Sequence, residues 1–230
     1  MDRGVTPVIG LLGGIGPAST SAYYSALIAQ GRRRLGRSPE IAVYSLDFER
    51  FTMLEETDQE GYVREIRRGL AALERAGSTV LAMAANSPHA VWDDVVDAVT
   101  APVVNMIEAV GRRAQELELQ RSLLLGIPFT LRRPFYAETC LAFGLAIELP
   151  DPRHHPLLRR AVYEELTHGI RSRKSRSELT AILEEHDVDS VILGCTELGG
   201  LIRQEHVPVP VLDSLRIHVD SILDTAASAA

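Results

Sequence analysis

Cysteine is scarce in this sequence, because Cys140 and Cys195 are its only two thiols. Two cysteines in 230 residues do not make a disulfide framework, and they are typical of a protein from a reducing compartment. A cytoplasmic location is therefore expected. The core must instead come from apolar burial, and 46% hydrophobic with 24% charged residues is the balance of a globular protein.

Positive charge is also in short supply. The formal net charge of −7 at pH 7 argues against general nucleic-acid binding. It does not exclude an anionic substrate, because backbone N–H groups and helix N-termini can make a site locally positive. The adjacent His154 and His155 have no acidic or cysteine partner at ligand spacing, so no metal site is expected.

Long apolar runs are absent as well. The longest falls far short of the roughly 20 residues that a membrane helix needs, so no membrane association is expected. Residues 1–4 lead into a strand-like segment without a preceding apolar h-region, and this predicts that no signal peptide is present.

What the sequence does contain is an alternation of short aliphatic runs with longer amphipathic stretches. The runs predict buried strands, and the stretches predict helices. The expected strands are 8–12, 41–46, 79–84, 103–105, 122–126, 145–149, 190–194 and 209–212, and the expected helices are 19–34, 62–76, 107–117, 134–143, 157–169, 177–186 and 214–226. This order predicts an α/β fold with mainly parallel sheets.

The two halves of the chain look alike. Leu-Leu-Gly ends a predicted strand at Gly13 and again at Gly126, and polar loops beginning at Ala85 and Cys195 follow later strands at a similar offset. This pattern suggests an internal duplication, although every α/β protein repeats strand, loop and helix. We expect two pseudo-symmetric α/β lobes, residues 1–101 with 213–230 and residues 102–212, with a ligand cleft between them.

Ligands are expected at the loops that follow the carboxyl ends of parallel strands. The first such loop, residues 13–20, is rich in glycine, and Ser19 or Thr20 can cap the helix after it. The spacing is not G-x-G-x-x-G, and Pro17 stands where that motif would continue. The loop therefore favours a carboxylate ligand over a dinucleotide.

Two further loops carry polar side chains. Asn86 and Ser87 follow a predicted buried strand and can donate to a ligand, although turn and capping chemistry uses the same residues. His89 suits a helix start or a core position better than a base. Thr130 can donate to a substrate carboxylate, and it can equally cap a helix.

The fourth loop holds Cys195, which follows a strand and precedes an expected helix. A thiol at the positive end of a helix has a lowered pKa, so a thiolate is expected here. Cys140 lies within an amphipathic helix beside Leu141 and Phe143, and we interpret it as a packing residue. Cys195 is thus the predicted reactive thiol.

Together these loops resemble the aspartate/glutamate racemase family. The matching segments are 13–20 followed by Tyr23-Tyr24, Asn86-Ser87 with His89, residues 124–130, Val-Ile-Leu-Gly-Cys-Thr-Glu-Leu at 191–198, and residues 208–213. The resemblance covers nearly the whole chain, and Gly-Cys-Thr-Glu-Leu is its most specific piece.

The resemblance implies two α/β lobes with the site between them, and an amino-acid racemase that uses no pyridoxal phosphate, metal or nucleotide. It also implies a homodimer. In this family one residue of each lobe flanks the α-carbon of the substrate. One residue removes the proton and the other delivers a proton to the opposite face.

By position, the resemblance makes Cys195 the acid/base of the second lobe. The implied contacts of the substrate are Gly14, Ile15, Gly16, Asn86, Ser87, Thr130, Thr196 and Glu197. The glycine turn shapes the site, and backbone amides and hydroxyls hold the carboxylate and stabilise the enediolate.

The sequence departs from the family where the thiol of the first lobe is expected, because Ala85 stands there. Ile127 also replaces a common threonine, and Ile170 stands where many aspartate racemases carry a lysine for the distal carboxylate. Three hypotheses follow: a racemase impaired by Ala85, natural or engineered; a one-thiol decarboxylase or isomerase of a small carboxylic acid; and a non-catalytic binder of small acids.

Overall fold

The computed structural model describes residues 7–228, so the segment 1–4 that bears on a signal peptide lies outside the described residues. The chain divides into two compact units, Met1–Asn105 with His218–Ala230 and Met106–Ile217. Across the described residues, no helix combines the length and the apolar character that a membrane crossing demands.

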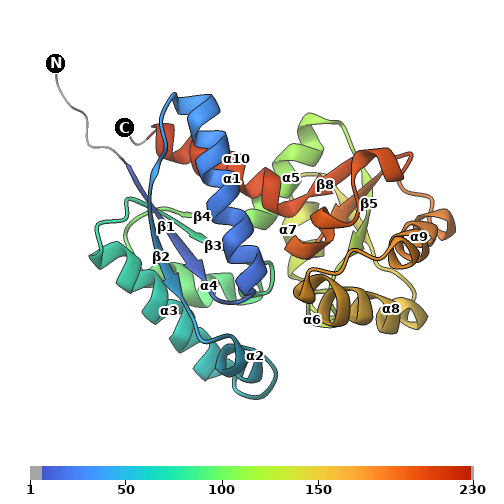
Figure 1. The fold of residues 1–230 in the computed structure, drawn as a ribbon, viewed down its shortest axis with the longest axis horizontal. Coiled ribbons are helices and arrows are strands. Elements are labelled where there is room, and N and C mark those ends of the chain that lie inside the picture. Colours follow the sequence, from blue (N-terminus) through green and yellow to red (C-terminus); the bar gives the residue numbers. More distant parts are fainter. Residues whose placement is uncertain (1–6, 229–230) are drawn as a thin grey trace. The chain divides into compact units, whose positions relative to one another are not determined.

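The first unit is built on a four-stranded parallel sheet of order β2-β1-β3-β4 (Figure 1). Its strands are β1 (Val8–Gly13), β2 (Glu40–Ser45), β3 (Val80–Met83) and β4 (Val103–Val104). Every residue of β3 is buried, which explains its continuous apolar sequence. Because β1 and β3 are neighbours, the loops that follow them lie at the same edge of the sheet.

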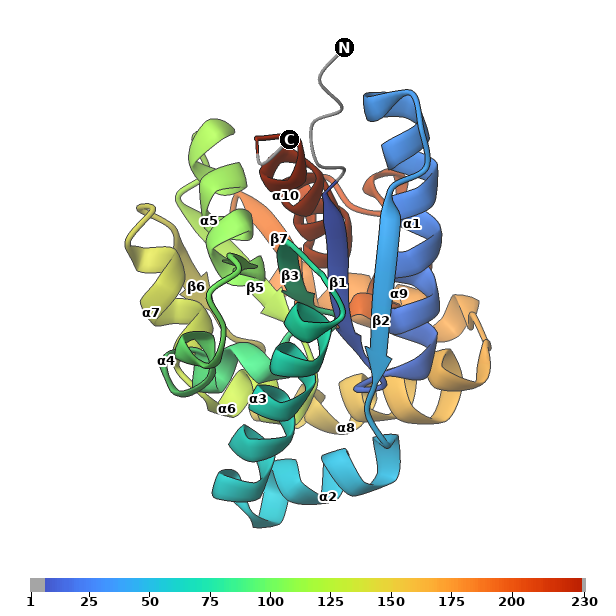
Figure 2. The same ribbon diagram turned by 90° about the vertical axis from the view of Figure 1, so that its left-hand side faces the viewer.

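Helices cover both faces of this sheet (Figure 2). They are α1 (Pro17–Leu35), α2 (Phe48–Thr57), α3 (Gln59–Arg75), α4 (Trp92–Val95) and α10 (Ser214–Ser228), joined by the 3₁₀ turns η1 (Ser87–Val91) and η2 (Val96–Ala98). A core on the α3 face joins Leu12 and Met83 to side chains of α2, α3 and α4.

Helix α3 shows how the sequence forms this face. The Asp58 carboxylate accepts a hydrogen bond from the Gly61 amide and caps the helix. Tyr62, Ile66 and Leu70 recur at helical spacing and are buried. Burying each such side chain contributes about 1.5–3 kcal/mol, so α3 is held by packing rather than by propensity.

The second unit repeats the design. Its strands are β5 (Arg121–Leu125), β6 (Ala146–Glu148), β7 (Ser190–Leu193) and β8 (Val211–Asp213), all parallel in the order β6-β5-β7-β8. In chain order, this is the same arrangement as in the first unit. The matching topologies support the internal duplication that the sequence suggested.

The helical segments of the second unit are shorter and less regular. They are α5 (Met106–Glu116), α6 (Pro128–Arg132), α7 (Phe135–Leu141), η3 (Pro152–His154), α8 (His155–Arg159), η4 (Arg160–Glu165), η5 (Leu166–His168), α9 (Arg173–Ala181), η6 (Ile182–Glu185), η7 (Thr196–Gly200) and η8 (Gln204–His206). The helix predicted over 157–169 is α8 followed by a π-helical turn, η4, and a 3₁₀ turn that ends at Gly169 with φ 74°.

The predicted α/β class with parallel sheets is confirmed, and each expected strand has its counterpart. The expected lobe boundaries need correction by a few residues. Strand β4 pairs with β3, so the first unit continues through Asn105 rather than ending at residue 101. Strand β8 pairs with β7, and the second unit therefore continues through Ile217 rather than ending at residue 212.

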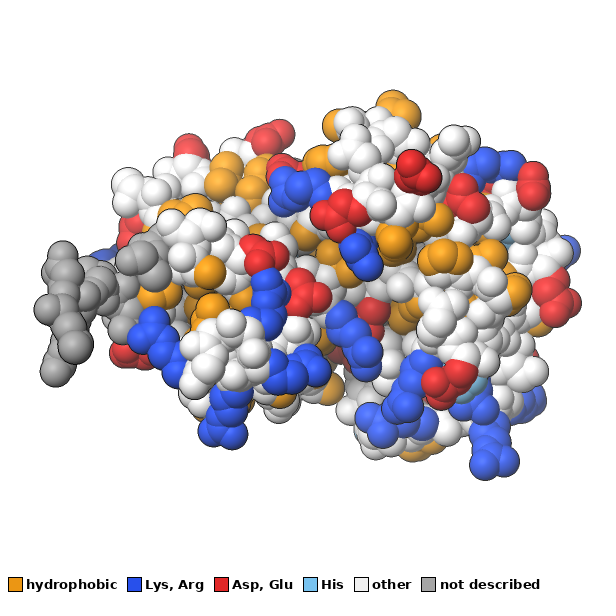
Figure 3. Space-filling view, turned by 90° about the horizontal axis from the view of Figure 1, so that it is seen from above, with side chains coloured by type: hydrophobic (Ala, Val, Ile, Leu, Met, Phe, Trp, Pro, Cys, Tyr) orange, Lys and Arg blue, Asp and Glu red, His pale blue; other side chains and the backbone are white. Residues whose placement is uncertain are grey.

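The surface seen in Figure 3 intersperses acidic and basic side chains with apolar ones. Many arginines in the described residues pair with a nearby carboxylate, as Arg121 does with Asp187 and Arg34 with Asp220. No single sign of charge dominates that face.

Candidate active site

Two loops of the first unit meet at the carboxyl ends of β1 and β3. The Ala84 amide donates to the Leu12 carbonyl at 2.8 Å, which carries the sheet pairing to the last residue before Ala85. The Ser19 hydroxyl donates to the Ala84 carbonyl at 2.7 Å. These two bonds fasten the start of α1 to the loop that begins at Ala85.

The glycine-rich turn after β1 has a conformation that requires glycine. Gly14 has φ 80°, and a Cβ built on it would lie 2.2 Å from the Leu46 carbonyl oxygen. The Gly14 amide donates to Thr20 Oγ1 at 2.9 Å, and that hydroxyl donates to the Gly16 carbonyl at 3.1 Å. The Gly14 amide is thus committed within the turn.

The expected cap of α1 is wrong. Gly16 occupies the N-cap position, and neither Ser19 nor Thr20 caps the helix. The Thr20 hydroxyl instead bonds within the turn and the Ser19 hydroxyl bonds to the loop after β3, because Pro17 begins the helix earlier than the apolar pattern suggested.

The loop after β3 buries its polar side chains. Asn86, Ser87 and His89 are 5%, 6% and 4% exposed. Asn86 stands at the N-cap of η1, but its side chain makes no capping hydrogen bond. Helix capping therefore does not explain why an asparagine stands at residue 86. The Ser87 Oγ lies 3.4 Å from the Tyr62 hydroxyl.

His89 is a neutral core histidine. Its Nδ1 lies 3.2 Å from the Asn86 carbonyl oxygen, and its ring stacks on Trp92. Burial lowers the pKa of His89 to about 4 despite its hydrogen bonds to the carbonyls of Asn86 and Ala85. His89 thereby holds the backbone on which Ala85 and Asn86 stand.

Sequence reasoning missed the partner of His89. The His218 ring meets His89 edge-on, with its Nδ1 2.9 Å from the Tyr23 hydroxyl and its Nε2 2.9 Å from the Val104 carbonyl. Nε2 must carry the hydrogen toward the carbonyl, so Nδ1 accepts from Tyr23. Burial first, and then His89, lower the pKa of His218 to about 3. A histidine within an apolar helical pattern gives no sequence signal of this network.

Two loops of the second unit meet in the corresponding place. The Gly194 amide donates to the Leu125 carbonyl at 2.7 Å, and a Cβ on Gly126 would lie 3.4 Å from the Gly194 carbonyl oxygen. The same Cβ position lies 3.5 Å from the Thr130 side chain. The loops after β5 and β7 are therefore in contact around Thr130.

Thr130 is not a helix cap. Ile127 is the N-cap of α6, and Thr130 lies within that helix. The Thr130 side chain is 1% exposed, and within residues 7–228 its hydroxyl has no hydrogen-bond partner. A buried hydroxyl without a partner costs about 1–3 kcal/mol, so it needs an explanation.

Cys195 stands at the N-cap of η7 with 8% exposure. Its Sγ donates to Glu197 Oε2 at 2.9 Å, and the Thr196 hydroxyl donates to the same oxygen at 2.9 Å. Burial, followed by the charge of Glu197 and the hydrogen bond to it, raises the pKa of Cys195 well above its usual range. The expected lowering of this pKa is wrong.

The physical reason for this correction is local. The segment after Cys195 is a five-residue 3₁₀ turn rather than a long α-helix, so little helix dipole reaches the thiol. A carboxylate within hydrogen-bond distance stabilises the thiol form. Cys195 is therefore a protonated donor in the free protein.

Two other groups of the second unit, the Tyr136 hydroxyl and the Cys140 thiol, also have raised pKa values. Tyr136, on α7, hydrogen-bonds Ser214, and its pKa is raised well above its usual range by burial and by the nearby Cys140 and Cys195. Cys140 is fully buried, and burial raises its pKa to about 12. The interpretation of Cys140 as a packing residue is confirmed, whereas Tyr136 carried no recognisable signal in the sequence.

No group of three or more His, Cys, Asp or Glu side chains within residues 7–228 is arranged to hold a metal ion. Each unit thus has its own set of polar loops at the carboxyl ends of its strands. The set of the first unit surrounds Ala85, and the set of the second unit surrounds Cys195.

Comparison with known proteins shows which family this chain belongs to. The family model for Asp/Glu/Hydantoin racemases matches residues 12–222. The chain is 21% identical over 224 residues to the broad specificity amino-acid racemase RacX of Bacillus subtilis strain 168, covering 95% of this chain and 97% of RacX.

Solved structures agree with this match. An aspartate racemase homologue from Pyrococcus horikoshii OT3 superposes with a TM-score of 0.85 and 34% identity, covering 97% of this chain and 100% of that one. The aspartate racemase of Picrophilus torridus has the same fold, with a TM-score of 0.80, 19% identity, and coverage of 96% and 94%. The chain belongs to the Asp/Glu/Hydantoin racemase family, a family of isomerases.

Proposed function

We propose that this protein is a cofactor-independent amino-acid racemase of aspartate/glutamate type, with Cys195 as an acid/base. The observation that carries the proposal is the buried Cys195 thiol, which donates to the Glu197 carboxylate at the end of β7. The substrate class is supported by RacX, a broad specificity amino-acid racemase, by the aspartate racemase homologue from Pyrococcus horikoshii and by the aspartate racemase of Picrophilus torridus.

In the proposed reaction, Cys195 protonates or deprotonates the α-carbon from one face. The raised pKa makes the thiol a weak acid, but it makes the thiolate a strong base once formed. Glu197 accepts the hydrogen bond of the Cys195 thiol in the resting state. We therefore assign Glu197 the role of orienting this thiol, and not that of binding a carboxylate of the substrate. Two negative groups at that point would repel each other.

The carboxylate of the substrate needs donors, and the proposal assigns them to Asn86, Ser87, Thr130 and Thr196. Thr130 is the strongest of these assignments, because its buried hydroxyl has no other partner among the described residues. A charge-assisted hydrogen bond to a substrate carboxylate would satisfy it. Gly14, Ile15 and Gly16 form the turn after β1, and in the first unit this turn neighbours the loop that carries Asn86 and Ser87.

The alanine at residue 85 favours one alternative function, a one-thiol decarboxylase or isomerase of a small carboxylic acid. A methyl group carries no exchangeable proton, so a one-thiol decarboxylase or isomerase would need only Cys195, which protonates a carbanion from one side. This alternative predicts release of CO₂ from a malonate-like acid, or isomerisation of an unsaturated one. Either activity would disappear in Cys195→Ala.

The test is α-proton exchange in D₂O, followed by NMR, with L- and D-aspartate and L- and D-glutamate. The chain and its Ala85→Cys variant are compared. We expect the variant to exchange both enantiomers of at least one amino acid. Absence of exchange from every substrate in Ala85→Cys would reject the racemase, and calorimetric binding without exchange would then indicate a small-acid binder.

The proposal includes a homodimer that works in the cytoplasm. Light scattering after size exclusion measures the dimer directly, and a mass of about one 25.2 kDa chain would contradict it.

A further inference from the structure

Ala85 leaves the first unit without the thiol that the proposed racemase would use there, but three oxygen-bearing side chains of that unit are linked to one another, and one of them lies on the same loop as Ala85. Ser87 is two residues along the same loop. The Tyr62 hydroxyl of α3 lies 3.4 Å from Ser87 Oγ and 3.2 Å from Glu55 Oε1 of α2. Side chains from three different elements therefore form one continuous chain of hydrogen bonds.

The direction of this chain follows from its donors and acceptors. A carboxylate can only accept, and a tyrosine hydroxyl has a single hydrogen, so Tyr62 donates to Glu55. The Tyr62 oxygen is then the acceptor that faces Ser87, whose hydroxyl hydrogen is free to rotate toward it. While Glu55 is ionised, the hydroxyl hydrogens of Ser87 and Tyr62 therefore both point toward Glu55.

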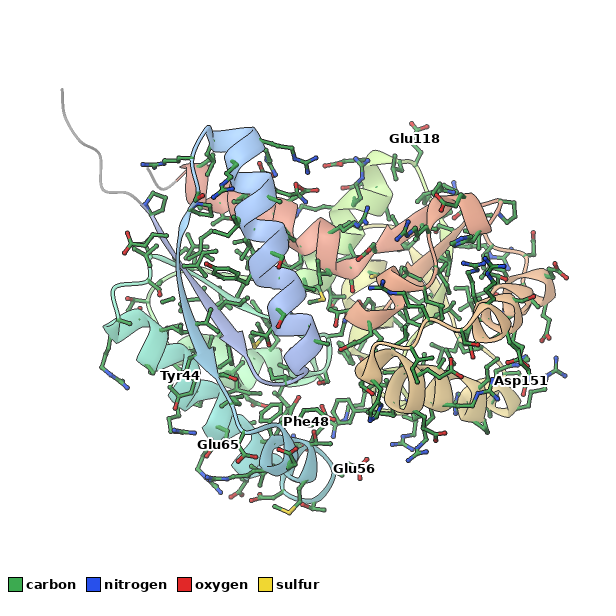
Figure 4. The ribbon with its side chains drawn as sticks, in the orientation of Figure 1. Tyr44, Phe48, Glu56, Glu65, Glu118 and Asp151 are labelled. Atoms are coloured by element: carbon green, nitrogen blue, oxygen red, sulfur yellow. The ribbon has the colours of Figure 1, made fainter. Side chains whose placement is uncertain are left out.

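The chain is held rigidly. Tyr62 is 2% exposed and stacks on Phe51, with ring centroids 4.6 Å apart and planes inclined by 30°. Ser87 is 6% exposed at the start of η1. Helix α2, whose two ends are marked by Phe48 and Glu56 in Figure 4, packs against α3 and carries Glu55. Packed side chains on helices keep a hydrogen-bond chain at a fixed length.

We infer that Glu55, acting through Tyr62 and Ser87, is the proton acceptor and donor of the first unit in place of a thiol at residue 85. This inference rests on the proposed racemase function. Ser87 is the catalytic residue, since it would touch the α-hydrogen, and Tyr62 and Glu55 are positioning residues that act through it. In this inference Ser87 no longer counts among the donors to the substrate carboxylate, which are then Asn86, Thr130 and Thr196, and it handles the α-proton instead.

The transfer balances without a further reagent. The Cα–H bond breaks, its electron pair stays on the substrate as the enediolate, and the proton passes to Ser87 Oγ. Ser87 passes its own hydrogen to Tyr62, and Tyr62 passes its hydrogen to Glu55, which becomes a neutral acid. Cys195 gives its Sγ hydrogen to the opposite face of Cα and becomes a thiolate. The other enantiomer runs the same steps in reverse.

The test measures α-proton exchange in D₂O for each enantiomer separately, in the parent protein and in its Tyr62→Phe and Glu55→Gln variants. Phenylalanine at residue 62 keeps the stack on Phe51 but removes the hydroxyl that links Ser87 to Glu55. Loss of an acid/base costs about 10²–10⁴-fold in rate, and we expect that loss for one enantiomer only, with KM unchanged. Tyr44→Phe, in the same unit, is the matched control, because the Tyr44 hydroxyl accepts from Arg68 instead.

A second variant separates chemistry from structure. Adding Ala85→Cys to Tyr62→Phe should restore the lost exchange, because a thiol then serves that face, whereas a misfolded protein would not recover. Equal slowing of both enantiomers, or no slowing of either, would overturn the relay. Exchange in Ala85→Cys but none in the parent chain would overturn the relay and leave the racemase standing. No exchange in either protein would overturn both.

Discussion

Cys195 and Cys140 are both buried thiols with raised pKa values, and what separates them is the acceptor within reach. Cys195 donates to Glu197, whereas the pKa of Cys140 is raised by burial alone. The sequence identified Cys195 from its place at a strand end. It did not predict the sign of the pKa shift, because that sign depends on how deeply the thiol is buried and on where the Glu197 side chain points.

The role of Glu197 can be measured at the thiol. Replacement Glu197→Gln removes the nearby negative charge, so the pKa of Cys195 should fall toward its usual range while burial continues to raise it. Thiolate absorbance near 240 nm, recorded against pH in a Cys140→Ala background, reports this value. An unchanged titration would mean that Glu197 does not govern the thiol.

Because the Thr130 hydroxyl has no partner among the described residues, we expect its removal to weaken substrate binding without lowering the stability of the fold. Thr130→Val keeps the shape of the side chain and removes a buried polar group that has no partner among the described residues. Urea unfolding should show equal or greater stability, by up to about 1–3 kcal/mol. A lost hydrogen bond to a charged carboxylate, worth about 1.5–3 kcal/mol, should raise KM by roughly ten-fold or more. A destabilised variant with an unchanged KM would contradict the assignment.

Among the elements, the turn after β1 is constrained by the backbone that packs against Gly14. Its glycines were recognisable in the sequence, but the reason for Gly14 was not, because the Leu46 backbone that it approaches lies beyond β2. The same limit applies to the caps of α1 and α6, which sequence spacing placed at Ser19, Thr20 and Thr130. A cap depends on backbone direction, which spacing alone does not give.

Gly14 and Gly36 provide a matched pair for testing this turn. Both have positive φ, 80° and 68°, but a Cβ on Gly14 would meet the Leu46 backbone, whereas a Cβ on Gly36 would meet nothing within 4 Å. Gly36→Ala should cost about 1–2 kcal/mol of unfolding free energy for its backbone strain. Gly14→Ala should cost about 1–3 kcal/mol more for overpacking, measured by urea denaturation. Equal costs would mean that the turn can shift.

The buried histidines of the first unit make stability depend on pH. The pKa values of His89 and His218 fall to about 4 and about 3 in the folded chain, against about 6.5 when unfolded. The unfolded chain therefore binds more protons below pH 6.5. Stability that is complete above this pH is lost as the pH falls toward 4, at about 1.4 kcal/mol per pH unit for each histidine.

The replacement His218→Gln tests how much His218 contributes to this pH dependence of stability. Its unfolding free energy, measured between pH 6.5 and 4, should fall less steeply than that of the parent chain, by about 1.4 kcal/mol per pH unit. His168→Gln is the control, because His168 lies exposed on η5. If the His218→Gln slope matched the parent slope, the buried pair would not be neutral in the folded protein.

At the scale of the molecule, the alternation of strands and helices was enough to predict the α/β class, the eight strands found within residues 7–228 and the likeness of the two halves. Helices α2, α4 and α6 were not predicted, because their short apolar patterns do not stand out from loops. Networks such as Tyr23–His218–Val104 join residues far apart in the chain, so no local pattern reveals them.

The same applies to the candidate site. Its loops were chosen from their positions after strands, and the structure places each of them at the end of a strand. The hydrogen-bond chain from Ser87 to Glu55 was not foreseen, because it joins three elements through side chains that look like ordinary helix residues in the sequence.

The most direct measurement of the central claim compares α-proton exchange in D₂O for Cys195→Ala, Cys140→Ala and the parent chain, using the amino acid that the parent exchanges fastest. We predict that Cys195→Ala loses about 10²–10⁴-fold in the rate of exchange, as expected for a missing acid/base. Cys140→Ala should keep the parent rate. Exchange by Cys195→Ala at the parent rate would contradict the assignment of Cys195 as the acid/base.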